Sequence, residues 1–192
     1  MAEPVITRIK RDGPPRESRN LEERFMVRSP AIWRRMSALS GRLLSPRSRL
    51  RRAAVRRSIL SGWDAVSRRD YELTQVRYSP DVEIMWDPEF EPLGLGGTFQ
   101  GHRGLREMAE GLADAWEQWA ITPALAIDLG DRVVTLGTMT LPGTASGLEL
   151  VSEVAQVAWI EDGLVVRERE FLSWDKGLTA AGLDPASVAV RP

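Results

Sequence analysis

The spacing of apolar residues changes along the chain, from a helical period in its first part to strict alternation in its second. In the first part apolar residues recur every three or four positions, which is typical of helices with one buried face. This pattern predicts a short helix beginning after Asn20 and further helices over residues 30–44, 48–67, 71–77 and 103–117. One extended run, residues 82–87, interrupts the helical part and precedes a loop rich in proline and glycine.

Later in the chain, apolar and polar residues alternate, as they do in strands with one buried face. Four strands are predicted, over residues 121–129, 132–141, 148–160 and 164–174. Turn-forming residues separate them, so consecutive strands should pair as an antiparallel meander. Because most helices precede most strands, the predicted fold class is α+β.

The distribution of charged residues along the chain predicts a division into an arm, a main domain and a tail. Residues 1–57 carry 16 Lys and Arg against 5 Asp and Glu, whereas residues 58–192 carry 10 against 22. We expect a basic, partly helical N-terminal arm at residues 1–47, a main domain at 48–182 and a C-terminal tail at 183–192. Within the arm, residues 1–19 contain few apolar side chains and are expected to form a mobile tail.

The arm also contains an apolar stripe at helical spacing, made of Trp33, Met36, Leu39 and Leu43, with arginines beside it. Two interpretations remain open. In the first, the stripe packs on the main domain or on a partner subunit while the arginines stay in solvent. In the second, the arm docks an anionic surface, either the headgroups of a membrane in peripheral contact or a nucleic acid. Nucleic acid is disfavoured because the sequence contains no recognised nucleic-acid-binding module.

The overall composition narrows the chemistry. Of the 192 residues 43% are hydrophobic and 28% are charged, and no apolar run approaches the ~18 residues of a membrane span. The chain has no cysteine and one histidine, which excludes disulfides, thiolate chemistry and a multi-histidine metal site. No cofactor is predicted, and the start of the chain lacks the apolar core of a secretory signal, so we expect a cytoplasmic protein. The preference for arginine over lysine is typical of a GC-rich bacterial genome.

Four motifs follow one another along the chain. They are Arg68-Arg69-Asp70-Tyr71 with Tyr78-Ser79-Pro80-Asp81-Val82-Glu83, then Gly97-Thr98-Phe99-Gln100-Gly101-His102-Arg103-Gly104, then Asp128-Leu129-Gly130-Asp131-Arg132-Val133-Val134, and last Ala155-Gln156-Val157-Ala158-Trp159 with Asp162-Gly163-Leu164-Val165-Val166. In order and spacing, over residues 50–182, they resemble the nuclear transport factor 2-like superfamily, especially its polyketide cyclase (SnoaL-like) branch.

This resemblance implies a cone-shaped, strongly curved antiparallel sheet wrapped around the helices, the cystatin-like or ketosteroid isomerase-like architecture. The open end of the cone would lead to an apolar cavity, and homodimers formed through the sheet are common in the superfamily. The superfamily contains isomerases, cyclases, epoxide hydrolases and non-catalytic binders. The resemblance therefore predicts a fold and leaves the reaction open.

Alternation along each strand predicts which side chains point into the cone. The inward set comprises Val82, Ile84 and Trp86, then Ser152, Val154, Gln156 and Ala158, and in the last strand Val166, Glu168, Glu170 and Leu172. In the last strand, Arg167, Arg169 and Phe171 take the opposite face.

Two catalytic arrangements known in the superfamily are not predicted here. In register with the ketosteroid isomerases, the catalytic base falls on Trp86, the oxyanion tyrosine on Gly62 and the protonated acid on Gln156. Epoxide hydrolases of the superfamily need an Asp-Arg-Asp set. Alternation turns Arg167 and Arg169 away from the carboxylates beside them.

Glu170 is the remaining candidate for a catalytic acid or base, and Gln156 is a candidate to orient a ligand carbonyl or hydroxyl. A carboxyl group on the apolar inner face has its pKa raised by desolvation, which suits proton transfer near neutral pH. Repulsion from Glu168 would add to this effect if both side chains point inward. The alternative is that Glu170 lies in solvent at the rim or pairs with an arginine across a subunit interface.

The predicted ligand pocket contains apolar and aromatic side chains together with two polar ones: Trp63, Trp86, His102, Met108, Leu112, Trp116, Val154 and Glu168. The alternative for the tryptophans is that they fill the cone as ordinary core. The alternative for His102 is that it caps the following helix or binds a loop carbonyl.

Two functions remain open at this point. The first is binding of a hydrophobic small molecule in the conical cavity, with acid–base catalysis of isomerase, cyclase or hydrolase type around Glu170 and Gln156. The second is a non-catalytic interaction module, in which tryptophans plug the cone and the basic arm docks a protein partner or an anionic surface.

Overall fold

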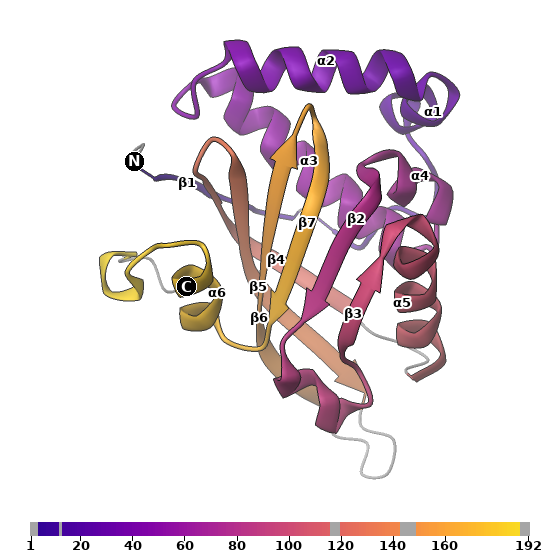
Figure 1. Cartoon of the computed structure of the whole chain (residues 1–192), viewed down its shortest axis with the longest axis vertical. Helices are drawn as coiled ribbons and strands as arrows, with labels where there is room; N and C mark the ends of the chain where they lie inside the picture. The colour runs from indigo at the N-terminus through magenta and orange to yellow at the C-terminus, as the bar shows by residue number, and fades with distance from the viewer. Residues whose placement is uncertain (1–3, 12, 116–119, 143–148, 189–192) are drawn as a thin grey trace.

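The computed structural model describes residues 4–11, 13–115, 120–142 and 149–188 of the chain. Its centre is a seven-stranded sheet in the order β1-β4-β5-β6-β7-β2-β3, whose two edges, β1 and β3, do not meet (Figure 1). The strands are β1 (Val5–Arg8), β2 (Tyr78–Trp86), β3 (Gly97–Gln100), β4 (Ala120–Asp128), β5 (Arg132–Pro142), β6 (Glu149–Glu161) and β7 (Leu164–Phe171). The α+β class is confirmed, and the sheet is open.

The helices α1 to α5 follow the predicted ranges to within a few residues, and α6 follows the last strand. They are α1 (Leu21–Arg28), α2 (Pro30–Leu43), α3 (Arg49–Ser67), α4 (Tyr71–Val76), α5 (Gly101–Ala115) and α6 (Trp174–Ala180), with the 3₁₀ turns η1 (Pro88–Leu93) and η2 (Pro185–Ser187). No helix in these described ranges is long and apolar enough to cross a membrane.

Local hydrogen bonds explain where two of the helices begin. The Asn20 side chain accepts from the backbone N–H of Glu23 at 2.8 Å, and the Glu23 carboxylate accepts from the backbone N–H of Asn20 at 3.0 Å. This reciprocal capping box satisfies two otherwise unpaired donors at the start of α1. Asp70 caps α4 in the same way, by accepting from the Leu73 N–H at 3.2 Å.

The sheet is mixed, which corrects the prediction of a purely antiparallel one. The meander from β4 to β7 pairs antiparallel as predicted, but β2 lies beside β7 and runs parallel to it, with Ile84 opposite Glu168 and Trp86 opposite Glu170. On its other side, β2 pairs antiparallel with β3. The chain reaches β7 only after α5 and three further strands, so adjacent strands in the sequence gave no information on this pairing.

Residues 4–11 are part of the fold, which corrects the prediction of a mobile tail at 1–19. β1 pairs antiparallel with the edge of β4, from Val5 opposite Asp128 to Arg8 opposite Leu125. Ile9 is buried with Ala126 and Val133 against α3. The sequence Val-Ile-Thr-Arg is too short to reveal itself as a strand without the exposed edge that it covers.

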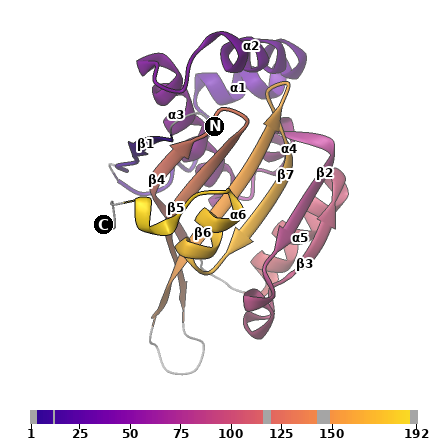
Figure 2. The ribbon, with the colours of Figure 1, turned by 60° about the vertical axis from the view of Figure 1, so that its left-hand side comes forward.

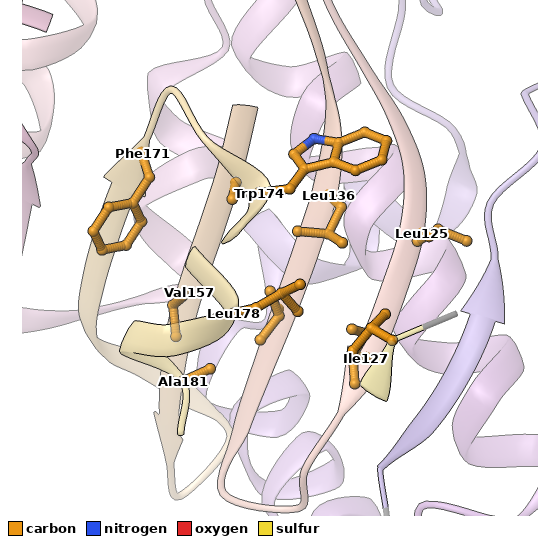
Figure 3. Close-up of a cluster of buried hydrophobic side chains, with 11 residues drawn as sticks. Leu125, Ile127, Leu136, Val157, Phe171, Trp174, Leu178 and Ala181 are labelled. Atoms are coloured by element: carbon orange, nitrogen blue, oxygen red, sulfur yellow. The ribbon is translucent and has the colours of Figure 1, made fainter. Parts of the chain in front are cut away.

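The outer face of the sheet carries its own apolar cluster. Leu125, Ile127, Leu136, Val157 and Phe171 pack there against one side of α6 (Figure 3). In Figure 2, α6 lies in front of the strands β5 to β7. The C-terminal segment thus covers part of the surface through which a homodimer was expected, and the dimer remains a prediction.

The inner face contains the side chains that alternation predicts, with one local exception. Val82, Ile84 and Trp86 are buried in one cluster with residues of α5. In β7 the register shifts, since Trp159 pairs with Arg167 but Ile160 pairs with Val165. This bulge leaves Val166 unpaired, so Val165 lies on the inner face where Val166 was predicted.

The first two helices cover one end of the sheet. In Figure 1, α2 lies across the upper end of the strands, with α1 beside it. Met26 of α1 is 1% exposed and packs with Ala65 of α3 and Leu73 of α4. The α2 helix is attached more loosely, because none of its residues is buried. Its Ser37 hydroxyl donates to the carbonyl of Gly163, in the turn between β6 and β7, at 3.3 Å.

Candidate functional site

A cavity of about 720 Å³ lies between the inner face of the sheet and the helices. The strands β2, β4, β5, β6 and β7 and the helices α3, α4 and α5 contribute to its wall. The helices α1 and α2 contribute as well, through residues such as Phe25, Trp33 and Ser37. Residues of α1 and α2 therefore form one side of the cavity, a role that their sequence pattern did not reveal.

Two carboxyl groups of β7 lie in the wall of this cavity. Glu168 and Glu170 are 2% and 5% exposed, and both line the cavity. The Tyr78 hydroxyl donates to Glu168 Oε2 at 2.7 Å, and Gln156 Nε2 donates to Glu170 Oε1 at 2.8 Å. Glu170 Oε2 is buried and accepts from no N–H or O–H of the described residues. Neither carboxyl group has an ion pair with an arginine or lysine of the described residues.

Burial changes the protonation of this pair. It raises the pKa of Glu168 to about 7, although hydrogen bonds from Tyr78, Glu170 and Gln156 oppose the change. Burial and then the charge of Glu168 raise the pKa of Glu170 well above its usual range. Burial and the same charge keep Tyr78 protonated by raising the pKa of its phenol well above the usual value.

The pair consequently holds at least one proton at neutral pH. Two adjacent carboxylates in an apolar site cannot both ionise cheaply, and one proton between them removes the repulsion. Glu170, with the more strongly raised pKa, retains the proton, and its otherwise unpartnered Oε2 can share that proton with Glu168. Glu168 then gains and loses its own proton near pH 7, as a general base in an apolar site must.

Several of the predicted pocket residues lie together in the wall. Trp63, Trp86, Met108 and Val154 line the cavity with Gln156 and the two glutamates. The Trp86 indole donates from Nε1 to the Met108 sulfur at 3.2 Å, which joins β2 to α5. Beside Trp63 and Trp86 the cavity remains, so these two side chains do not fill it.

The other predicted pocket residues are placed differently. His102 does not line the cavity, and its Nε2 lies 3.1 Å from the Tyr78 carbonyl oxygen, which ties the start of α5 to β2. The structure gives no side-chain description of Leu112, and Trp116 lies outside the described residues. Among the described residues, no group of three or more His, Asp or Glu side chains is arranged to hold a metal ion.

The sequence interpretation missed Tyr78 and Arg77, which both line the cavity. For Tyr78 a signal existed, because counting back by twos from Trp86 places it on the inner face of β2. For Arg77 no local signal existed. Its guanidinium is held by Ser58 and Ser61 of α3, a contact that only the packing of α3 against the end of α4 creates.

Solved structures with this fold come from several proteins. TerC, co-crystallised with polyporic acid, is 26% identical to the chain, over 66% of this chain and 92% of TerC, with a TM-score of 0.54. A nuclear transport factor 2-like protein of unknown function from Burkholderia pseudomallei is 23% identical, over 64% of this chain and 93% of that protein, with a TM-score of 0.55.

A third similar structure has a ketosteroid isomerase-like fold and comes from Catenulispora acidiphila, in complex with trimethylamine. It is 17% identical, over 70% of this chain and 97% of that one, with a TM-score of 0.50. No curated protein matches the chain. The SnoaL-like domain family matches residues 60–168, which is more than half of the chain. The chain therefore belongs to the SnoaL-like family of the nuclear transport factor 2-like superfamily, as its motifs predicted.

Proposed function

We propose that the protein binds an apolar small molecule in this cavity and that Glu168 and Glu170 transfer protons to and from it. One observation carries the proposal: two buried carboxyl groups without a cationic partner line an otherwise largely apolar cavity. Such a pair costs stability, because buried ionisable groups are normally compensated by an opposite charge. A folded protein gains nothing structural from it that apolar side chains would not supply, whereas proton transfer requires it.

The division of roles follows from the two pKa values. Glu168, with a pKa of about 7, is the base that removes a proton from a carbon next to a substrate carbonyl. Glu170 holds a proton and gives it to the carbonyl oxygen, so that a C–H bond breaks, an O–H bond forms and an enol results. Glu168 then returns its proton to a different carbon while Glu170 takes back the O–H proton, which completes an isomerisation. In a cyclisation the enol carbon attacks a second carbonyl carbon, Glu168 gives its proton to that carbonyl oxygen, and Glu170 takes back the enol O–H proton.

The comparisons support the binding part of this proposal. The SnoaL-like match covers the strands β2 to β6 and most of β7, including Glu168. TerC, the most identical of the structures described above, was co-crystallised with a small organic molecule.

The proton-transfer step can be tested with a substrate that requires only a base in an apolar cavity. In 5-nitrobenzisoxazole, a carboxylate removes the ring C–H proton, the released electrons form a nitrile, and the N–O bond breaks to give a coloured cyanophenolate. We expect saturable turnover whose rate rises with pH around a midpoint of about 7, following Glu168. Glu168→Gln should lower the rate by roughly 10²- to 10⁴-fold.

Glu161→Gln provides the matched control, because Glu161 is an exposed carboxylate at the end of β6. That variant should keep the wild-type rate. Equal rates for wild type and Glu168→Gln would exclude proton transfer by this pair. Binding of apolar probes, measured in parallel, shows whether the cavity itself remains functional.

A second candidate function rests on the outward face of α2. Ile32, Met36, Leu39 and Leu43 form a stripe along this helix, and each is more than half exposed. Residues 24–63 contain 11 arginines and no acidic residue. A helix with an apolar stripe beside arginines has the chemistry to lie on an anionic membrane surface. We propose such peripheral contact for α2, which would place the cavity beside the source of an apolar ligand.

Vesicle sedimentation tests this contact. The protein should bind vesicles of phosphatidylcholine mixed with phosphatidylglycerol but not phosphatidylcholine alone, and Leu39→Glu with Leu43→Glu should abolish binding. Thr98→Glu, an exposed site on β3, is the matched control. Loss of self-association in the Leu39→Glu, Leu43→Glu variant, with no vesicle binding by wild type, would instead identify the occupant of this face as a second copy of the chain.

A further inference from the structure

Arg77 is a cationic side chain in the wall of the cavity that lacks a carboxylate partner. Its Nη1 donates to the carbonyl oxygen of Ser58 at 2.6 Å and to the hydroxyl of Ser58 at 3.0 Å. Its Nη2 donates to the Ser61 hydroxyl at 2.8 Å. Its Nε is buried and has no hydrogen-bond partner among the residues that the structure describes. Burial lowers the pKa of Arg77, so the charge is held at a cost by neutral partners.

Arg77 differs from the neighbouring arginines, which form ion pairs with carboxylates. Four neighbouring arginines of the same region form ion pairs with carboxylates: Arg11 and Arg16 with Asp64, Arg19 with Asp70 and Glu72, and Arg68 with Glu23 and Asp70. These four carboxylates are thereby compensated. Glu23 reaches Arg77 only through the hydroxyl of Ser61. Glu22 and Glu23 attract the charge of Arg77 from a distance, but neither forms an ion pair with it in the described part of the chain.

The edge of the Arg77 guanidinium formed by Nε and Nη2 is only partly paired, and its geometry suits a carboxylate. In arginine, Nε and Nη2 form one fork of parallel N–H donors that fits the two oxygens of a carboxylate. This protein uses that fork elsewhere: Arg51 donates from Nε and Nη2 to the two oxygens of Asp128 at 2.7 and 2.8 Å. Arg19 binds Asp70 through the same two nitrogens. In Arg77, Nε is buried without a partner among the described residues, and Nη2 has a second hydrogen beyond the one given to Ser61, so this fork is incomplete.

Other arginines do not share this combination. Arg56 and Arg132 also have a buried Nε without a partner, but neither lines the cavity. Arg42 and Arg51 line the cavity but pair with Asp162 and Asp128. Arg57 lines the cavity but is exposed, so solvent would screen any contact that it makes. Among the described residues, Arg77 alone combines the three properties.

We propose that Arg77 binds a carboxylate of the ligand, so that the cavity takes apolar molecules that carry one carboxylate group. The inference rests on the proposed function and names the ligand class for the same cavity. Arg77 directly precedes Tyr78, whose hydroxyl binds Glu168. A carboxylate at Arg77 thus fixes the ligand at one end while its apolar body extends along the wall toward Glu168 and Glu170.

The test compares two fluorescent probes of equal shape, dansylaminoundecanoic acid and its primary amide. The wild-type protein should bind the acid roughly ten- to a hundredfold more tightly than the amide, because a desolvated two-point pair with arginine distinguishes a carboxylate from a neutral group. Arg77→Gln should bind the two probes equally, by losing affinity for the acid and keeping affinity for the amide. Arg77→Lys should retain part of the preference, since it keeps the charge and loses the fork.

Two control variants locate the binding site. Arg103→Gln removes an exposed arginine of α5 that lies outside the cavity wall and should leave the preference for the acid unchanged. Ala158→Trp places a large side chain in the cavity wall opposite Glu168 and should abolish binding of both probes. Retention of the preference in Arg77→Gln would overturn the assignment.

The outcomes separate this inference from the proposed function. Equal affinity of the wild type for acid and amide would refute the role of Arg77 and leave the cavity and its proton transfer intact. Absence of binding by either probe would refute both. The comparison in the wild-type protein requires no variant to fold, so it stands even if Arg77→Gln is unstable.

Discussion

Two groups of buried carboxyl residues in this protein have opposite environments. Beside the N-terminal segment, Glu23, Asp64, Asp70 and Asp128 each form an ion pair with one or more arginines. On β7, Glu168 and Glu170 have only Tyr78, Gln156 and each other. Both groups are largely buried, so burial alone does not distinguish them. They differ in whether a positively charged side chain pairs with the carboxylate.

The directions of the pKa changes express this difference. Burial by itself would raise the pKa of Glu23, but hydrogen bonds from Ser61 and Asn20 and the charge of Arg68 together lower it. The pKa of Asp70 is lowered for the same reasons, with Arg19 as the main partner. On β7 burial prevails, and both glutamates have raised pKa values. A compensated carboxylate holds the fold together, whereas an uncompensated one retains a proton that can be transferred.

The largest expected effect comes from removing one partner of a compensated pair. Arg51→Met leaves Asp128 buried without its cation and should lower the free energy of unfolding by about 3–5 kcal/mol. Glu170→Gln should change it by less than about 1 kcal/mol, because Glu170 is already neutral and glutamine keeps its shape and a donor. Urea denaturation at neutral pH measures both values. A similar loss in the two variants would show that the β7 pair is structural as well.

The next effect is the pH dependence of stability. Glu168 and Glu170 have folded pKa values above their unfolded values, so their protonated forms favour folding at low pH, and this contribution is lost as the pH rises through about 7. We expect the wild type to lose a few kcal/mol of stability between roughly pH 5 and pH 8.

The variant that carries both Glu168→Gln and Glu170→Gln should show a much smaller loss over the same range. Glu23 and Asp70 have lowered pKa values and contribute in the opposite direction: their stabilisation is present above the unfolded pKa and is lost in more acidic solution. Thermal melts across the pH range separate the two groups. A wild-type curve with no decline above pH 5 would contradict the raised pKa values.

A smaller effect is expected from Tyr78→Phe. The Tyr78 hydrogen bond lowers the pKa of Glu168, so its removal should raise that pKa further. A hydrogen bond worth about 1.4 kcal/mol corresponds to a change of about one in the pKa of its acceptor. The midpoint of the pH–rate profile for 5-nitrobenzisoxazole should therefore move upward by about one pH unit, while the free energy of unfolding changes little. A downward shift would mean that Tyr78 does not stabilise the Glu168 carboxylate.

The smallest effect is expected from Asn20→Ala, which removes the capping box of α1. Loss of such a cap costs about 1 kcal/mol of unfolding free energy. The variant changes the compensated region and leaves the β7 pair untouched, so the rate per folded molecule should equal that of the wild type. A reduced rate at full folding would show that α1 helps to form the reactive site as well as the cavity wall.

Most of the secondary structure follows from short stretches of sequence. Helix periodicity, strand alternation, the caps Asn20 and Asp70 and the turn residues depend on neighbours in the chain, so the predicted ranges agree with the observed ones to within a few residues. The failures are those that depend on distant partners. β1 exists because β4 offers an edge, and β2 runs parallel to β7 because the meander returns to its side.

In the candidate site, too, the features set by neighbouring residues were predicted and those set by distant partners were not. Alternation placed Glu168 and Glu170 on one face and Arg167 and Arg169 on the other, but it could not reveal the bulge that moves Val166 off the inner face. His102 was included in the pocket because of its chemistry, and the structure places its ring against the Tyr78 carbonyl instead. Arg77 had no feature in the sequence to separate it from the other arginines.

The sequence by itself determined the elements, the family and which side chains share a strand face, because these depend on local spacing and on motifs. Only the tertiary structure decided which buried charges are compensated. Arg51 meets Asp128 across 77 positions of the chain, and Tyr78 meets Glu168 across 90. No local pattern encodes such pairings, since they arise when helices and strands pack. Whether a carboxyl group stabilises this fold or holds a transferable proton is therefore a property of the folded chain.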